Sequence, residues 1–123
     1  MGSNSDFGVD SIPMKQWTRE QIMKGMKEMV PEITFLRKSE DFDGTKGGIW
    51  TCGEHDWLYK GLPPFDYSVE YGDFQRDNGM KVKTMYVKGI HREIYSWLEE
   101  RGWYPRWYDN GTLFFWQEVS NIK

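Results

Sequence analysis

Four side chains that can bind metals or take part in nucleophilic chemistry lie close together near the middle of the chain. They are Cys52, Glu54, His55 and Asp56. A thiol beside an imidazole can form a nucleophilic pair, and all four side-chain types can bind zinc. Adjacent residues of an extended segment point in opposite directions, however, and a tetrahedral site would need a distant fourth ligand. We therefore predict a solvated turn here, with no metal and no other cofactor.

The remaining histidine, His91, is no better candidate for an active-site residue. It lies two residues before Glu93, at the predicted beginning of a helix, and lacks a second ligand four residues further on. The chain also contains no Gly-x-Ser-x-Gly pattern, which would mark a nucleophile elbow. We predict no catalytic residues and keep a small enzyme with a site near Cys52 and His55 only as the second alternative.

An aromatic stretch near the C-terminus, residues 103–116, is the strongest candidate for a binding site. Its two halves read as short strands joined by Asn110-Gly111. This pair is typical of type I′ hairpin turns, because both central residues of such a turn have positive φ. A two-residue turn at this place sets Tyr108 opposite Leu113.

The alternation of side chains along these two strands predicts two aromatic faces with different roles. One face packs in the core and carries Trp103, Trp107, Phe114 and Trp116. The other carries Tyr104, Arg106, Tyr108, Leu113 and Phe115. An arginine among rings suits stacking on a planar group or on the aromatic side chains of a partner. We predict that the second set of residues forms a binding surface.

The loop at residues 53–65 contains Trp57, a further aromatic residue that could belong to the binding surface. Two consecutive prolines near its end exclude both a helix and a laddered strand there. A long aromatic loop of this kind often has a function, so Trp57 is the sixth candidate binding residue. The alternative interpretation is that the loop covers an open end of the core, including the aromatic face itself.

We expect this surface to bind another protein, so that the chain acts as a non-catalytic binding or accessory module. The first alternative is a single-stranded nucleic-acid-binding module. In that case bases would stack on the same rings, and phosphates would contact Arg106 together with Lys81, Lys83 and Lys88. The net charge of −3, from 16 basic and 19 acidic residues, is too balanced to attract nucleic acid or an anionic membrane by its long-range field.

Two amphipathic helices are predicted to support these segments. Thr18 and Gln21 have the spacing of a capping box, and apolar residues follow at helical spacing until Pro31. A second apolar stripe starts at Ile90, and Gly102 occupies the position that ends a helix.

Strands are predicted between and after the helices, in antiparallel hairpins. The register of the middle hairpin pairs Asp73 with Lys83 and Gln75 with Lys81, because opposite charges then meet. The predicted strands are residues 32–37, 49–52, 67–75 and 80–87, with a turn at Asp77-Asn78-Gly79, followed by the aromatic hairpin.

These elements predict an α+β fold, a two-layer sandwich in which two helices pack on one face of an antiparallel sheet of about five or six strands. Residues 14–123 form a single domain in this interpretation, and residues 1–13 form a flexible N-terminal arm.

Composition supports a small globular protein with an unusual core. The 123 residues include no alanine, and 17% are aromatic, so large flat side chains must fill the interior. No apolar run could span a membrane, and the single cysteine forms no internal disulfide. We expect a soluble, cytoplasmic protein. A small acidic chain so rich in aromatic residues also suggests an origin in a phage or mobile element.

Overall fold

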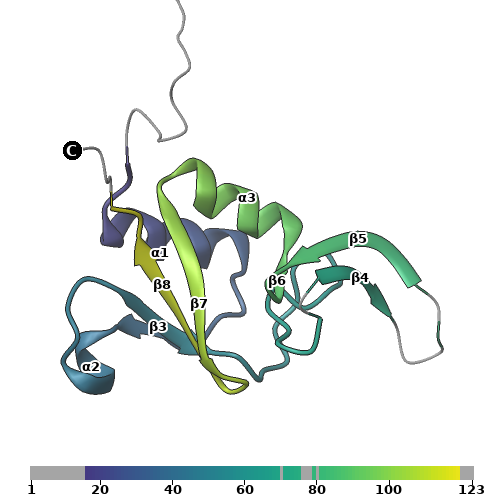
Figure 1. Cartoon of the computed structure of the whole chain (residues 1–123), viewed down its shortest axis with the longest axis horizontal. Coiled ribbons are helices and arrows are strands. Elements are labelled where there is room, and N and C mark those ends of the chain that lie inside the picture. Colours follow the sequence, from purple (N-terminus) through teal and green to yellow (C-terminus); the bar gives the residue numbers. More distant parts are fainter. Residues whose placement is uncertain (1–15, 70, 76–78, 80, 120–123) are drawn as a thin grey trace, which may run out of the picture.

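The computed structural model describes residues 16–69, 71–75, 79 and 81–119 (Figure 1). The predicted arm at residues 1–13 and Asp77 and Asn78 of the predicted turn lie outside the described residues. The elements, in chain order, are α1 (Arg19–Met29), β2 (Leu36–Lys38), α2 (Glu40–Asp43), β3 (Ile49–Cys52), β4 (Tyr71–Gln75), β5 (Lys81–Val87), β6 (Ile90–His91), α3 (Arg92–Glu100), β7 (Trp103–Asp109) and β8 (Thr112–Gln117).

The strands form two sheets, and this confirms the α+β class while changing its layout. Strands β2, β3, β8 and β7 form a four-stranded antiparallel sheet in that order, and β4, β5 and β6 form a three-stranded sheet. The expectation of one sheet with five or six strands is wrong. The irregular loop at residues 53–65 lies between β3 and β4 in the chain (Figure 1). The next three strands pair with one another, whereas β8 returns to pair with β3.

Helix α1 begins and ends as its sequence predicts. The Thr18 hydroxyl accepts a hydrogen bond from the Gln21 amide, and the Gln21 side chain accepts one from the Thr18 amide. These two bonds satisfy amides at the helix start that lack partners within the helix. The helix ends at Met29, just before Pro31. Its predicted stripe is buried at Ile22 and Met26.

Helix α3 begins two residues later than its apolar stripe suggests. Lys88 and Gly89 have φ values of 54° and 75°, as a type I′ turn requires, and Val87 pairs with Ile90 across this turn. Ile90 therefore belongs to β6. His91 is the N-cap of α3, and its Nδ1 accepts a hydrogen bond from the Glu93 amide at 3.1 Å.

The hydrophobic core lies between these two helices and one face of the four-stranded sheet. The core side chains of α1 and α3 pack with inward-facing residues of β3, β7 and β8. The 53–65 loop closes one end of this layer, because Trp57 and Phe65 belong to the same core. The central members are Ile22, Met26, Ile94, Leu98, Ile49, Trp103, Leu113 and Phe115.

The middle hairpin has the predicted pairing near its tip only. Gln75 pairs with Lys81 as expected, whereas Asp73 pairs with Met85 instead of Lys83. An irregularity between Asp73 and Phe74 causes this shift. Bulges of this kind insert residues into one strand and change the register beyond them.

The turn at Lys88 provides a test of backbone strain. A side chain at positive φ costs about 1 kcal/mol relative to glycine. We therefore expect Lys88→Gly to raise the free energy of unfolding by roughly 0.5–1 kcal/mol in urea denaturation. Lys38→Gly in strand β2 serves as the control and should lower it, because glycine costs entropy in a strand. A loss of stability in Lys88→Gly would contradict the turn assignment.

Candidate functional site

The aromatic hairpin of β7 and β8 has its turn at the predicted place but with a different geometry. Asp109 pairs with Thr112, so Asn110 and Gly111 are the two central residues. Neither belongs to the described residues with positive φ, which excludes the predicted type I′ turn. Instead, Asp109 Oδ1 accepts a hydrogen bond from the Gly111 amide at 2.9 Å. An aspartate at this position stabilises the turn through its side chain.

Tyr108 forms a β-bulge beside this turn, and the bulge changes which rings face the core. The strand pairing passes from Asp109–Thr112 directly to Trp107–Leu113, leaving Tyr108 without an opposite residue. From there on each residue of β7 lies opposite a residue one position earlier than predicted, so Arg106 pairs with Phe114. A shift by one residue moves a side chain to the other face of the sheet.

The predicted division of the rings is therefore wrong for β8. Leu113 and Phe115 are fully buried in the core, whereas Phe114 and Trp116 lie on the opposite face. Trp103 is in the core as predicted. The signal for a bulge was not visible in the sequence, because the Asn-Gly pair suits a hairpin without one.

The 53–65 loop packs against Phe115 in the core. Trp57 is 9% exposed, stacks on His55 with ring centroids 4.4 Å apart, and belongs to the core. Phe65 of the same loop contacts Phe115 at 5.7 Å. Leu113, Phe115 and Trp57 are thus unavailable as surface contacts.

The other three predicted residues, Tyr104, Arg106 and Tyr108, lie together on the side of the sheet away from α1 and α3. Arg106 and Tyr108 are exposed, and Tyr104 is half-buried. We call this surface the outer face. It consists of Arg37, Phe42, Trp50, Tyr104, Arg106, Tyr108, Phe114 and Trp116.

A row of four side chains crosses the outer face from edge to edge. Arg37 of β2 pairs with Trp50 of β3, Trp50 pairs with Phe114 of β8, and Phe114 pairs with Arg106 of β7. Directly opposed residues point to the same face of a sheet. The two arginines therefore flank two aromatic residues in this row, and the Cα atoms of the arginines lie about 14 Å apart across three strand spacings.

Helix α2 places a further ring over the middle of this row. Phe42 meets Trp50, Tyr108 and Phe114 edge to face, with centroids between 5.0 and 5.2 Å apart. Phe114 is consequently only 6% exposed. This helix has only four residues, too few for an apolar periodicity, so no sequence pattern places Phe42 in the site.

The loop that carries α2 is fixed by polar contacts. Arg19 of α1 donates to Glu40 at 2.8 Å and to the Gly48 carbonyl at 3.1 Å. The buried Ser39 hydroxyl donates to the Thr45 carbonyl and accepts from the Gly48 amide. These contacts hold Phe42 against the sheet.

Trp116 completes the outer face beside Tyr104, its strand neighbour on β7. Its ring stacks on Phe114 with a centroid distance of 5.5 Å and lies across Gly48. A Cβ atom at Gly48 would come within 2.4 Å of the Trp116 ring, so only glycine fits there. Both Trp116 and Tyr104 remain half-buried.

The cluster around Cys52 and His55 does not form an active-site arrangement. Burial raises the pKa of the Cys52 thiol, which disfavours the thiolate that nucleophilic chemistry needs. Burial lowers the pKa of His55, whose Nδ1 accepts from the Trp57 amide. Among the described residues, no group of three metal-ligating side chains is close enough to hold an ion.

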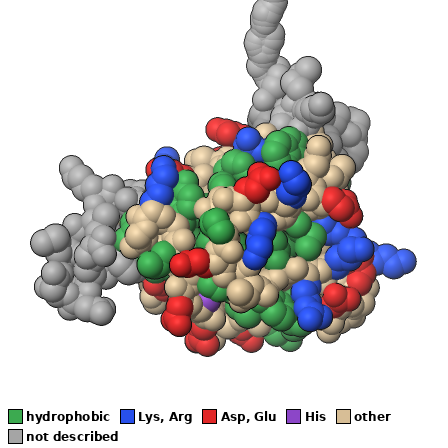
Figure 2. Space-filling view, turned by 180° about the vertical axis from the view of Figure 1, so that it is seen from behind, with side chains coloured by type: hydrophobic (Ala, Val, Ile, Leu, Met, Phe, Trp, Pro, Cys, Tyr) green, Lys and Arg blue, Asp and Glu red, His purple; other side chains and the backbone are tan. Residues whose placement is uncertain are grey.

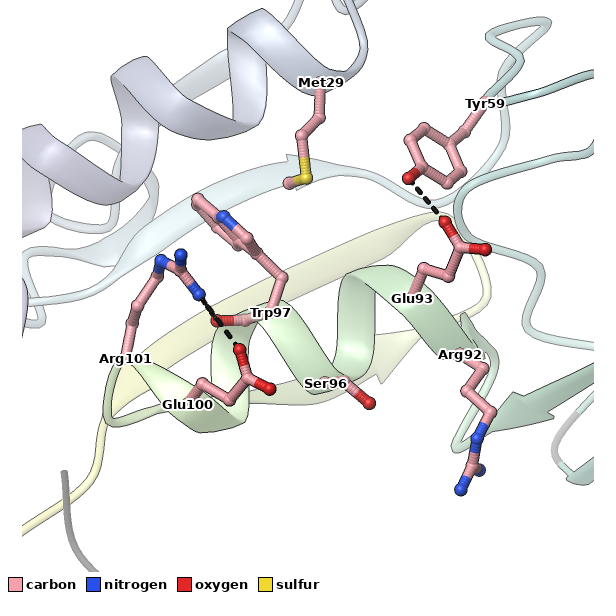
Figure 3. Close-up of a pocket in the computed structure, with 8 residues that line it drawn as sticks. All are labelled: Met29, Tyr59, Arg92, Glu93, Ser96, Trp97, Glu100 and Arg101. Carbon is pink, nitrogen blue, oxygen red and sulfur yellow. Dashed lines mark hydrogen bonds and ion pairs between the residues drawn. The ribbon is translucent and has the colours of Figure 1, made fainter.

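An open groove of about 510 Å³ lies on the helix side of the molecule, between α1, α3 and the 53–65 loop (Figure 3). Trp97 and Met29 face each other across it, with Arg101 at one end and Glu93 toward the other (Figure 3). Glu93 accepts hydrogen bonds from Tyr59 and Lys60, in that order the main causes of its lowered pKa.

Three of the four charged residues that line this groove, Glu93, Glu100 and Arg101, contact other residues of the chain, and the fourth, Arg92, is exposed. The Arg101 guanidinium lies between the rings of Trp17 and Trp97, at 4.6 and 4.9 Å, and donates to the Trp97 carbonyl. Burial raises the pKa of Tyr59, so its hydroxyl stays protonated at neutral pH.

Seen from behind, the molecule shows hydrophobic side chains interspersed with both positive and negative groups (Figure 2). Neither sign of charge dominates this side. Within the part of the chain that the structure describes, no helix is long and apolar enough to cross a membrane.

Comparisons of this chain with protein-family models, with curated proteins and with solved structures find no match.

The ion pair between Arg19 of α1 and Glu40 of α2 predicts that the free energy of unfolding depends on pH. Hydrogen bonds from its own backbone amide and from the Gly47 amide, together with Arg19, lower the pKa of Glu40 to about 2 from 4.5. Its contribution to stability is complete above pH 4.5 and is lost as the pH falls toward about 2. Glu40→Gln should therefore be less stable than the wild type at neutral pH, with the difference shrinking between those pH values in urea titrations. A constant difference at all pH values would contradict this link.

The two faces of the hairpin predict opposite effects of truncating their rings. Phe115→Ala should destabilise the fold by about 3–5 kcal/mol, because it leaves a cavity in the core. Tyr108→Ala should cost at most about 2 kcal/mol, the size of two exposed aromatic pairs, because the Tyr108 ring contacts Phe42 and Phe114. Chemical denaturation of the two variants measures both values. Equal losses would show that Tyr108 belongs to a core as well.

Proposed function

We propose that this chain is a non-catalytic protein-binding module that uses the outer face to dock a partner. The observation that carries the proposal is Tyr108, which is 66% exposed at the bulge, beside the exposed Arg106. Two half-buried rings, Tyr104 and Trp116, continue the surface along the hairpin. Rings and arginines held in this way can bind another molecule without any chemical step.

The composition of the outer face matches the residues that dominate binding energy at protein interfaces. Tryptophan, tyrosine and arginine are enriched in such hot spots. Trp50 and Trp116 are held in place by their neighbours, since Trp50 contacts Phe42 and Trp116 stacks on Phe114. A partner would therefore lose little side-chain entropy on binding them, which favours affinity.

The charges around this surface favour a protein over nucleic acid. Helix α2 carries Glu40, Asp41 and Asp43 next to the rings, and these carboxylates would repel a phosphate backbone. Lys88, a predicted phosphate contact, lies at the turn of the other sheet. Lys81 and Lys83 also belong to that sheet, in β5.

The enzyme alternative has less support than binding. A raised thiol pKa at Cys52 and a lowered imidazole pKa at His55 are the reverse of what an activated cysteine–histidine ion pair shows.

Photo-crosslinking from the outer face tests this proposal directly. A benzophenone amino acid at Tyr108 should form crosslinks to a polypeptide in cells that naturally express the chain. The matched control is the same substitution at Tyr67, which is 51% exposed but contacts Trp107 on the core side of the sheet. Crosslinks from Tyr108 and not from Tyr67 would support a docking surface.

Two outcomes would count against the proposal. Equal crosslinking from both positions would mean that the outer face is not selective. Adducts removed by nuclease, together with oligonucleotide binding in fluorescence polarisation at about 50 mM salt, would favour the nucleic-acid alternative.

A further inference from the structure

We infer that the partner of the outer face is a second copy of this chain, in a weak dimer with two-fold symmetry. The inference rests on the proposed function, because it names the occupant of the same surface. Its basis is that the outer face and the adjoining helix α2 together carry charges of both signs next to the exposed ring of Tyr108, and that these charges form no ion pair within the described part of the chain. Such a patch can be complementary to itself.

The unpaired charges are two arginines and one aspartate. Arg37, Arg106 and Asp41 are all exposed, and none takes part in an ion pair within the described part of the chain. The Arg37 guanidinium does lie over the Phe35 ring, 5.4 Å from its centroid. The neighbouring carboxylates are already engaged. Glu40 is paired with Arg19, and the Asp43 side chain accepts a hydrogen bond from Thr45.

The positions of Asp41 and Arg106 fit a two-fold arrangement. Asp41 adjoins Phe42, whose ring lies on Phe114 and Tyr108. Arg106 is the strand partner of Phe114, and Asp41 directly precedes Phe42 in α2, so the two charged residues come from neighbouring positions at the outer face. In a two-fold dimer every contact between two different residues occurs twice. If residue i of one copy meets residue j of the other, then residue j of the first copy also meets residue i of the second. One symmetry axis between the two charges would therefore form two ion pairs, Arg106 with Asp41 in each direction.

The size of the surface predicts weak association. Three strand spacings and about six residues give a sheet face of about 14 by 20 Å, near 300 Å². Stable complexes bury about 800 Å² on each partner. Even with the added area of α2, the dimer belongs to the weak class and should form reversibly at high protein concentration.

Sedimentation velocity on the purified full chain over a concentration series tests the inference by charge reversal. The wild type should show a reversible monomer–dimer equilibrium. Arg106→Glu alone and Asp41→Arg alone should each weaken dimerisation about tenfold or more, because both symmetric contacts become repulsive. Mixing these two variants should restore dimers, since the mixed dimer contains two attractive pairs. Arg92→Glu, an exposed arginine on α3, is the control and should dimerise like the wild type.

Three results would overturn the dimer. They are a wild type that stays monomeric throughout the series, charge-reversed variants that associate like the wild type, and a mixture that does not associate. The proposed function fails separately. If the purified chain is monomeric while Tyr108 still crosslinks to a different polypeptide in cells, the dimer is wrong and protein binding stands. If neither occurs, both fail.

Discussion

The bulge at Tyr108 is the constraint on which the rest of this structure depends. The Asp109 side chain accepts from the Gly111 amide, and the turn that results has no residue at positive φ. Turns other than the primed types fit the twist of a two-residue hairpin poorly, and a bulge adds local twist. Because Tyr108 has no opposite residue in β8, Phe115 faces the core and Phe114 faces outward.

Two aromatic layers follow from that register, one on each side of the four-stranded sheet. The inner layer joins Phe115, Phe65 and Trp57 under the helices and the 53–65 loop. In the part of the chain that the structure describes, Phe42 on the four-residue helix α2 packs over the outer layer, and Phe35 meets Trp50 edge to face. The ion pair between Arg19 of α1 and Glu40 joins that short helix to α1. The rings of the outer layer are thus held by the sheet and by α2, while the side chains of Tyr108 and Arg106 are exposed to solvent.

Local signals in the sequence predicted those parts that depend on local chemistry. The capping box at Thr18, the end of α1 before Pro31, and Gly102 with φ of 82° after α3 were all correct. The two turns at Lys60-Gly61 and Lys88-Gly89 were missed, although both have paired positive φ values. Lysine is not among the residues that favour this conformation, so the pattern carries a weak signal.

The candidate site was predicted only in part, for a geometric reason. Tyr104, Arg106 and Tyr108 do share one face of the sheet, because they occupy alternate positions along β7. Their neighbours on β8 were misassigned, since a single bulge reverses the side on which every later residue of the partner strand lies. Trp50 and Arg37 come from other strands, and only the order of strands in the sheet brings them to the same row.

Cross-strand nuclear Overhauser effects in the β7–β8 hairpin test this account most directly. The bulged register predicts backbone contacts that link Arg106 to Phe114 and Tyr104 to Trp116. A regular two-residue hairpin would instead link Arg106 to Phe115 and Tyr108 to Leu113. Finding the second set would put Phe115 on the outer face and contradict the division of the rings on which the proposed surface rests.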